Sequence, residues 1–244
     1  MAIRKTPTSR GTAPEPAAKP RITPPASSAL GAKLRMVRER SGTTVRGMAR
    51  AVGVSPSLVS QIERGLVMPS VGTLYAITNE LGMTVDDVFQ EDHEATSRPK
   101  PAGLTPWAEA PTPRDPVQRR ETRRSIRLAS GVRWEMLTAT PDDQLEFLYV
   151  VYEVGGESCA DDSLMHHGGK EYAYLLSGRL GVKIGFDEFE IGPGDSISFD
   201  AQRPHRLFAI GNEPAVAVWA VLNRQGDRRT RRPGIQAGRG IRKA

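Results

Sequence analysis

The spacing of apolar residues changes once along this chain, and that change constrains its fold more than any other feature. From Leu30 to Phe89 apolar residues recur at helical spacing, and four glycines divide the segment into about five short helices. From about Ser125 onward the pattern has a period of two, which is typical of strands. The dividing glycines are Gly42, Gly53, Gly65 and Gly82. We therefore expect an α + β chain with a helical domain followed by a β domain.

The β block consists of short runs separated by turn residues. They read EFLYVVYEV, EYAYLLSGRLGVKIG, DEFEIG, DSISFD, HRLFAIG and AVAVWAVLN. Because no helical pattern interrupts them, the block predicts a sandwich or a small barrel.

Composition sets the expected boundaries. Residues 1–29 and 223–244 are basic and lack apolar periodicity, so we expect disordered tails. Residues 91–122 are rich in proline and predict a linker between domains at 30–90 and 123–222. The net charge of +6 comes mainly from the two tails, whereas block 123–222 is acidic. Any claim of nucleic-acid binding must therefore rest on motifs rather than on charge.

Two further features suggest the compartment. Cys159 is the single cysteine, which excludes an intrachain disulfide framework and fits a reducing compartment. No apolar run approaches the length of a membrane span, and the N-terminal residues lack the apolar stretch of a secretory signal. We expect a cytoplasmic protein that does not enter a membrane.

The stretch TVRGMARAVGVSPSLVSQIERG has the division of faces that a helix-turn-helix requires. Thr44 is suited to cap one helix, Gly53 to form the tight turn, and Ser55 to cap a second helix. Val59 and Ile62 then face inward. The outward residues of the second helix are Ser55, Pro56, Ser57, Ser60, Gln61 and Arg64.

Residues 30–89 resemble the lambda-repressor-like helix-turn-helix of the XRE family, most clearly over LVSQIERGLVMPSVGTLYAITNELGMTVDDVF. The resemblance implies that helix 55–64 is the recognition helix and that Arg38 pairs with Glu63 to brace it. It also places Arg46 and the loop 65–70 beside the phosphate backbone. Val45 stands where the family often has a glutamine that contacts a phosphate, so we expect that contact to be lost.

The stretches LMHHGGKEYAYLLSGRLGV and GPGDSISFDAQRPH resemble the two motifs of the cupin superfamily, over about residues 145–222. The resemblance implies a small β-barrel, the double-stranded β-helix. Metal-binding cupins supply two histidines and a glutamate from the first motif and a histidine from the second. His167, Glu171 and His205 match three of these positions, and Met165 falls on the fourth. A thioether is a poor ligand for divalent iron, manganese or zinc.

Three interpretations of this cluster stay open. The histidines are structural, or the cluster binds a small-molecule effector without a metal, or it holds a divalent metal such as Zn, Fe, Mn or Ni with open positions. His166 faces the opposite side of an extended strand and would need a bulge to join. We add Tyr174 and Arg133 to the predicted effector pocket, since an arginine can bind a carboxylate through two hydrogen bonds.

A helix-turn-helix followed by a cupin resembles the XRE–cupin transcriptional regulators of bacteria. The resemblance implies a sensor whose barrel binds a small metabolite and thereby changes how the helical domain engages an operator in double-stranded DNA. We expect a homodimer on a pseudo-palindromic operator, because a single recognition helix reads too few bases. We expect no catalysis. One alternative is a metal-dependent cupin enzyme, a dioxygenase or isomerase, tethered to DNA. Another is a DNA-binding protein whose barrel only dimerises.

Overall fold

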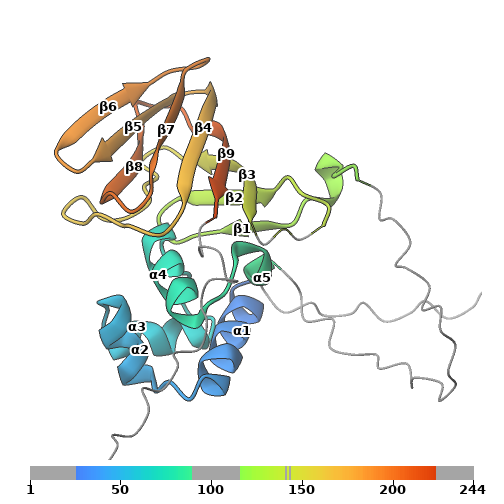
Figure 1. The fold of residues 1–244 in the computed structure, drawn as a ribbon, viewed down its shortest axis with the longest axis vertical. Helices are drawn as coiled ribbons and strands as arrows, with labels where there is room; N and C mark the ends of the chain where they lie inside the picture. Colours follow the sequence, from blue (N-terminus) through green and yellow to red (C-terminus); the bar gives the residue numbers. More distant parts are fainter. Residues whose placement is uncertain (1–25, 90–115, 141, 143, 224–244) are drawn as a thin grey trace, which may run out of the picture.

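The computed structural model describes residues 26–89, 116–140, 142 and 144–223. A bundle of helices packs against one end of a barrel of strands (Figure 1), so the expected two-part α + β architecture is confirmed. The predicted C-terminal tail apart from its first residue, most of the N-terminal tail and most of the linker lie outside the described residues. No helix in the described ranges is long and apolar enough to cross a membrane.

Five helices form the bundle, as the glycine pattern predicts. They are α1 (Ala26–Arg40), α2 (Val45–Val52), α3 (Pro56–Glu63), α4 (Val71–Leu81) and α5 (Val85–Phe89). Helix α1 begins at Ala26, inside the predicted tail, because alanine is a good helix former and the last residues of that tail continue the turn of the helix. Leu34, Met48, Val59, Ile62 and Leu74 are almost fully buried and form the centre of the bundle.

The barrel consists of two antiparallel sheets. Its strands are β1 (Ser125–Arg127), β2 (Val132–Met136), β3 (Leu145–Tyr152), β4 (Lys170–Ser177), β5 (Arg179–Ile184), β6 (Asp187–Ile191), β7 (Ser196–Asp200), β8 (His205–Ile210) and β9 (Ala215–Leu222). Six strands pair in the order β1-β2-β3-β9-β4-β7, and three in the order β6-β5-β8. A short 3-10 helix (Arg120–Thr122) precedes β1, where a linker was predicted.

Strand alternation on β4 decides which side chains enter the barrel. Glu171 and Leu175 point inward and are buried, whereas Tyr172, Tyr174 and Leu176 point outward and are exposed. Strand β9 pairs with β4 and brings Trp219 to the same interior. The interior of the barrel therefore receives Glu171 from one strand and an indole from its neighbour.

Candidate DNA-reading helix and buried histidine–glutamate site

Helix α3 has the geometry expected of a recognition helix. The Ser55 hydroxyl accepts a hydrogen bond from the backbone N–H of Leu58 at 3.1 Å, and Pro56 occupies the first helical position. Val59 and Ile62 anchor the helix in the bundle. The opposite face is left open to a partner.

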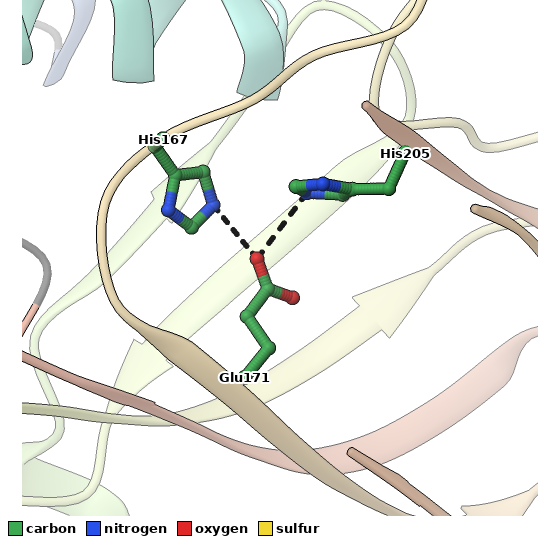
Figure 2. A group of neighbouring side chains, drawn as sticks. All are labelled: His167, Glu171 and His205. Atoms are coloured by element: carbon green, nitrogen blue, oxygen red, sulfur yellow. Dashed lines mark ion pairs between the residues drawn. The ribbon is translucent and has the colours of Figure 1, made fainter. Parts of the chain in front are cut away.

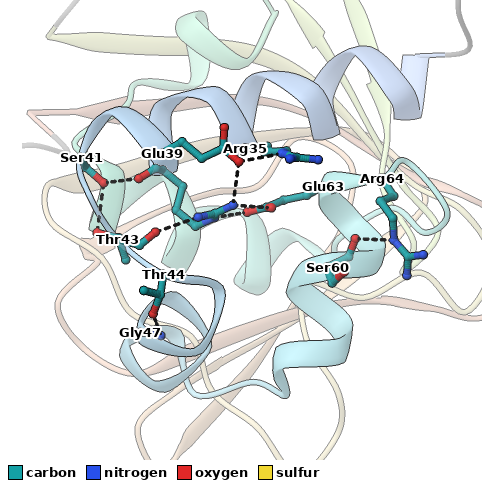
Figure 3. Close-up of polar contacts among 10 residues, drawn as sticks. Arg35, Glu39, Ser41, Thr43, Thr44, Gly47, Ser60, Glu63 and Arg64 are labelled. Atoms are coloured by element: carbon teal, nitrogen blue, oxygen red, sulfur yellow. Dashed lines mark hydrogen bonds and ion pairs between the residues drawn. The ribbon is translucent and has the colours of Figure 1, made fainter.

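None of the predicted DNA-contacting residues is buried. Those that are exposed are Arg46, Ser55, Pro56, Ser57 and Arg64, while Ser60 and Gln61 are half-buried. Arg46 lies on α2, and Thr44 caps that helix by accepting from the backbone N–H of Gly47 at 3.0 Å. Arg64 ends α3, where its Nε donates to the carbonyl oxygen of Ser60 at 3.2 Å. Figure 3 shows both contacts.

A buried ion pair joins α1 to the end of α3, as the family resemblance implies. Arg38 donates to both carboxylate oxygens of Glu63, at 2.5 Å from Nε and 2.9 Å from Nη2 (Figure 3). Its Nη1 also donates to the carbonyl oxygen of Thr43 at 2.7 Å. The predicted pairing is confirmed, and the bidentate geometry fixes α3 relative to α1.

Three polar side chains meet inside the barrel. His167 comes from the loop before β4, Glu171 from β4 and His205 from the start of β8. The Oε1 atom of Glu171 lies 2.7 Å from Nε2 of His167 and 3.3 Å from Nε2 of His205 (Figure 2). All three side chains are buried. We call this set the triad.

The other polar atoms of the triad are held by the protein. Nδ1 of His167 donates to the carbonyl oxygen of Gly168 at 2.9 Å, and Nδ1 of His205 donates to that of Arg203 at 2.8 Å. Since a carbonyl oxygen only accepts, each Nδ1 carries a proton, and in a neutral ring the Nε2 atom then has a lone pair. The second oxygen of Glu171 accepts from the indole Nε1 of Trp219 at 2.8 Å.

The three remaining atoms face one another without a well-directed hydrogen bond. They all lie within 4.8 Å of one another. Two nitrogen lone pairs facing a carboxylate repel it, so a proton or a cation between them is needed to stabilise the arrangement. A divalent metal fits this donor set, because histidine ligands of metals donate their other N–H to a protein acceptor in the same way.

The charge of the site follows from burial and from these contacts. Burial raises the pKa of Glu171, but its contacts with His167 and His205 outweigh burial and lower that pKa from 4.5 to about 2. Burial lowers the pKa of His205, but the contact with Glu171 raises it overall above 6.5. The buried carboxylate is therefore ionised at neutral pH and attracts positive charge.

A small cavity of about 20 Å³ adjoins Glu171, enough for about one water molecule. Its walls come from both domains. Helix α4 supplies Val71 and Tyr75, and the ring of Tyr75 stacks on His167 with the ring centroids 4.3 Å apart. The barrel supplies Trp134, Leu148, Val150, Tyr152, Met165, Leu207 and Trp219.

Two family models match the chain, a helix-turn-helix domain over residues 29–89 and a cupin domain over residues 143–221. The HTH-type transcriptional regulator PuuR of Escherichia coli (strain K12) is 22% identical over 179 residues, which cover 72% of this chain and 85% of PuuR. The uncharacterized HTH-type transcriptional regulator YazB of Bacillus subtilis (strain 168) is 33% identical over 58 residues, which cover 24% of this chain and 84% of YazB.

The chain belongs to the helix-turn-helix family and carries a cupin domain. A crystal structure of an HTH_3 family transcriptional regulator from Vibrio cholerae has the same fold, with a TM-score of 0.55 at 22% identity. The match covers 80% of this helix-turn-helix cupin protein and 96% of the Vibrio chain.

Two predicted pocket residues of this helix-turn-helix cupin protein do not lie with the triad. Tyr174 is three residues from Glu171 on β4, so alternation turns it to the outer surface, where it is 49% exposed. Arg133 also projects from the outer face of its sheet, on β2, and pairs there with Glu135. The two-residue period of a strand separates both residues from the triad.

His166 is exposed, as the alternation of an extended strand predicts, and Met165 is buried beside the cavity. Trp219 and Tyr75 were not among the predicted site residues. Trp219 carried a weak signal, because AVAVWAVLN predicts a strand with one face inside. Tyr75 carried none, since its place in this helix-turn-helix cupin protein depends on how the two domains dock.

Proposed function

We propose that this chain is a DNA-binding transcriptional regulator whose barrel senses a small molecule. The observation that carries the proposal is the exposed face of α3, held rigidly by the buried pair of Arg38 and Glu63. A helix with free polar side chains and fixed orientation is suited to the major groove. The similarity to PuuR, an HTH-type transcriptional regulator, over 72% of this chain supports the same conclusion.

We assign the residues of α3 and its surroundings to two kinds of contact. Gln61 has the donor and acceptor needed for an adenine edge, and the serines can bond several bases. Arg46 and Arg64 are exposed cations at the rim of this face and are suited to phosphates. Phosphate contacts then supply most of the affinity, and the base contacts supply the sequence preference.

We expect the regulator to act as a homodimer on a pseudo-palindromic operator. One recognition helix reads few base pairs, whereas two related by a symmetry axis read two half-sites about one helical turn apart. The outer face of the six-stranded sheet supports this, because Tyr172, Tyr174 and Leu176 are 42%, 49% and 44% exposed beside a shallow groove of about 330 Å³. Since the operator lies on the chromosome, we expect the chain to work in the cytoplasm.

We also propose that the triad binds a divalent cation. His167, Glu171 and His205 would hold it, and Zn, Fe, Mn and Ni all accept nitrogen and oxygen ligands. Such an ion would offer open positions to oxygen or nitrogen atoms of an effector. The fit rests on the three converging atoms that lack directed hydrogen bonds.

Two alternatives differ from this proposal in what the barrel does. A metal-dependent enzyme would use the same three ligands, and Met165 at the fourth position speaks against the complete ligand set of such enzymes. A barrel that only dimerises would bind no ligand. In a barrel that only dimerises, the triad would be a set of paired polar groups in a closed interior, with a purely structural role.

Genome-wide footprinting of the purified full-length chain tests the DNA-binding part of the proposal. We expect protected sites with two related half-sites, and neighbouring genes that indicate the class of metabolite. A Ser57→Asp, Gln61→Asp double variant is the matched control, because two carboxylates on α3 repel DNA without touching the core. Identical and sequence-independent protection by both proteins would contradict the proposal.

Metal analysis and a thermal-shift screen test the sensing part. We expect a divalent metal in the purified protein, lost in a His167→Ala, His205→Ala variant and kept in His166→Ala, whose ring is exposed. A small molecule that binds the native state must raise the melting temperature. Metal-dependent turnover of such a molecule would favour the enzyme, and the absence of both metal and ligand would favour the dimerising barrel.

A further inference from the structure

We propose that helix α4 of the DNA-binding domain is the lid of the barrel. An organic molecule then reaches the triad only when the helical domain moves away from the barrel. This inference rests on the proposed sensing function for its biological meaning, but its structural content is tested without an effector or an operator. It follows from the contacts between the two domains and from the size of the cavity beside the triad.

Tyr75 on α4 closes the space above the triad. Its ring stacks on His167 with an interplanar angle of 28°, and it lies 5.3 Å from the ring of Trp134, centroid to centroid. The Tyr75 hydroxyl donates to Oε2 of Glu146 at 3.2 Å. The other oxygen of this buried carboxylate accepts from the backbone N–H of Val85, at the start of α5, at 3.4 Å. A buried carboxylate of the barrel is thus satisfied by the helical domain.

The backbone of α4 itself lies on the barrel at Gly72. The N–H of Gly72 donates to the carbonyl oxygen of Ser158 at 2.9 Å. A Cβ atom at position 72 would lie 3.3 Å from Cβ of Met165 and 3.4 Å from Cβ of Cys159. Glycine therefore permits an approach that leaves almost no gap between the helix and the loop that leads to His167.

Further polar contacts flank α4 on both sides. The N–H of Ala129, in the β1–β2 turn, donates to the carbonyl oxygen of Pro69 at 3.0 Å. Asp86 on α5 is buried and lies 3.3 Å from Arg124, and it accepts from the backbone N–H of Asp142 at 3.2 Å. Burial of a carboxylate is costly unless it has such partners, so the docked arrangement is a specific one.

The size of the cavity gives these contacts a consequence. About 20 Å³ accommodates a water molecule or a metal ion but no metabolite of several heavy atoms. A larger ligand must take the space that Tyr75 fills. Because α4 packs against α1 and α2, a displacement of α4 moves the whole helical domain with it. Docking and occupation of the barrel by an organic ligand therefore exclude each other, which couples the two sites thermodynamically.

The chain offers a direct test, because its single cysteine lies under α4. Disulfides have Cβ–Cβ separations of about 3.5–4.5 Å, and a Cβ at position 72 lies 3.4 Å from that of Cys159. We expect full-length Gly72→Cys protein to form an intrachain disulfide when treated with diamide. Asn79→Cys, at an exposed position of the same helix, is the matched control and remains unlinked. Equal cross-linking of the two variants, or none in Gly72→Cys, would overturn the docked lid.

Diethyl pyrocarbonate then serves as the organic probe of the triad, with peptide mass spectrometry to locate each modified histidine. In the oxidised Gly72→Cys protein, treated with EDTA to remove any metal, we expect His167 and His205 to react at least tenfold more slowly than in the EDTA-treated reduced protein. His166 is exposed in the same peptide and should react equally in both states. Equal rates for His167 and His205 in the two states would overturn the lid.

A second variant covers the case in which Gly72→Cys does not fold. Tyr75→Ala removes the lid contact and adds no atoms, so we expect faster modification of His167 than in the native chain. An unchanged rate would overturn the proposal. Failure of the ligand screen leaves a lidded barrel without a ligand, whereas failure of these tests leaves a regulator without a lid, so the two failures are distinguishable.

Discussion

Gln61 lies in the last turn of α3 and is half-buried, and we propose that it distinguishes bases. We expect Gln61→Ala to weaken binding to the footprinted operator by about 1–3 kcal/mol and to relax the preference at one base pair. Fluorescence anisotropy with the operator and with single-base variants measures both effects. An equal loss for every sequence would assign Gln61 to the backbone instead.

Arg46 should behave differently, because an exposed cation at the start of α2 is suited to a phosphate. We expect Arg46→Ala to weaken binding to all sequences alike and to reduce the slope of log K against log salt by about 1. The same anisotropy titrations at several salt concentrations measure this slope. A change in base preference with an unchanged slope would contradict the assignment.

The residue-level site was partly readable from the sequence. His167, Glu171 and His205 came from the resemblance, and the structure brings them together. The two-residue period of strands also places Tyr174 and Glu171 on opposite faces of β4. The donation from Trp219 to Glu171 required the pairing of β9 with β4, which no local pattern reveals.

At the scale of elements, the pair of Arg38 and Glu63 determines how α3 is presented. Both side chains are almost fully buried, so removal of one leaves the other charged and desolvated. We expect Arg38→Met to destabilise the helical domain by about 3–5 kcal/mol and the Arg38→Met, Glu63→Leu double variant by less. Urea unfolding of the full-length chain, followed by circular dichroism, gives these free energies.

A matched control uses the exposed pair of Arg35 and Glu39 on the same helix. Because water solvates both charges, Arg35→Met should leave the unfolding curve unchanged. If Arg38→Met behaved like Arg35→Met, the buried pair would have no bracing role.

Elements with strong local signals were predictable. The caps at Thr44 and Ser55 and the glycine stops mark the short helices, because each satisfies backbone groups at a helix end. Strand β1 has three residues and was not among the predicted runs. Its pairing with β2 stabilises it more than its own composition does.

At the scale of the whole molecule, the outer face of the six-stranded sheet is the expected dimer surface. We expect Tyr174→Lys to shift the full-length chain from dimer to monomer, because a buried cation without a partner opposes association. Light scattering coupled to size-exclusion chromatography measures the mass. The monomer should also bind a complete operator much more weakly than the dimer does, since it engages one half-site.

Lys183→Glu, a charge change on the other sheet, is the control for that prediction. It should leave the mass unchanged. A dimeric Tyr174→Lys protein would place the interface elsewhere.

The relation between the two domains was the part that the sequence did not reveal. A proline-rich linker predicts how far apart the two domains can lie, but not whether they touch. The sequence of α4 is that of an ordinary helix of the DNA-binding family. Gly72 and Tyr75 gain their importance from the barrel, which lies far away along the chain. Such contacts depend on how the domains dock and produce no periodic pattern in the sequence.

The hydrogen bond from Trp219 to Glu171 has a practical consequence. The indole is bonded to the carboxylate that faces the two histidines. Its fluorescence therefore reports on what is bound between those histidines. Paramagnetic cobalt or nickel bound there should quench the emission of Trp219, and a Trp219→Phe variant, which keeps Trp107 and Trp134, should lose part of that response. Occupancy of the barrel is then measurable in a cuvette, without any label, before the metabolite or the operator is known.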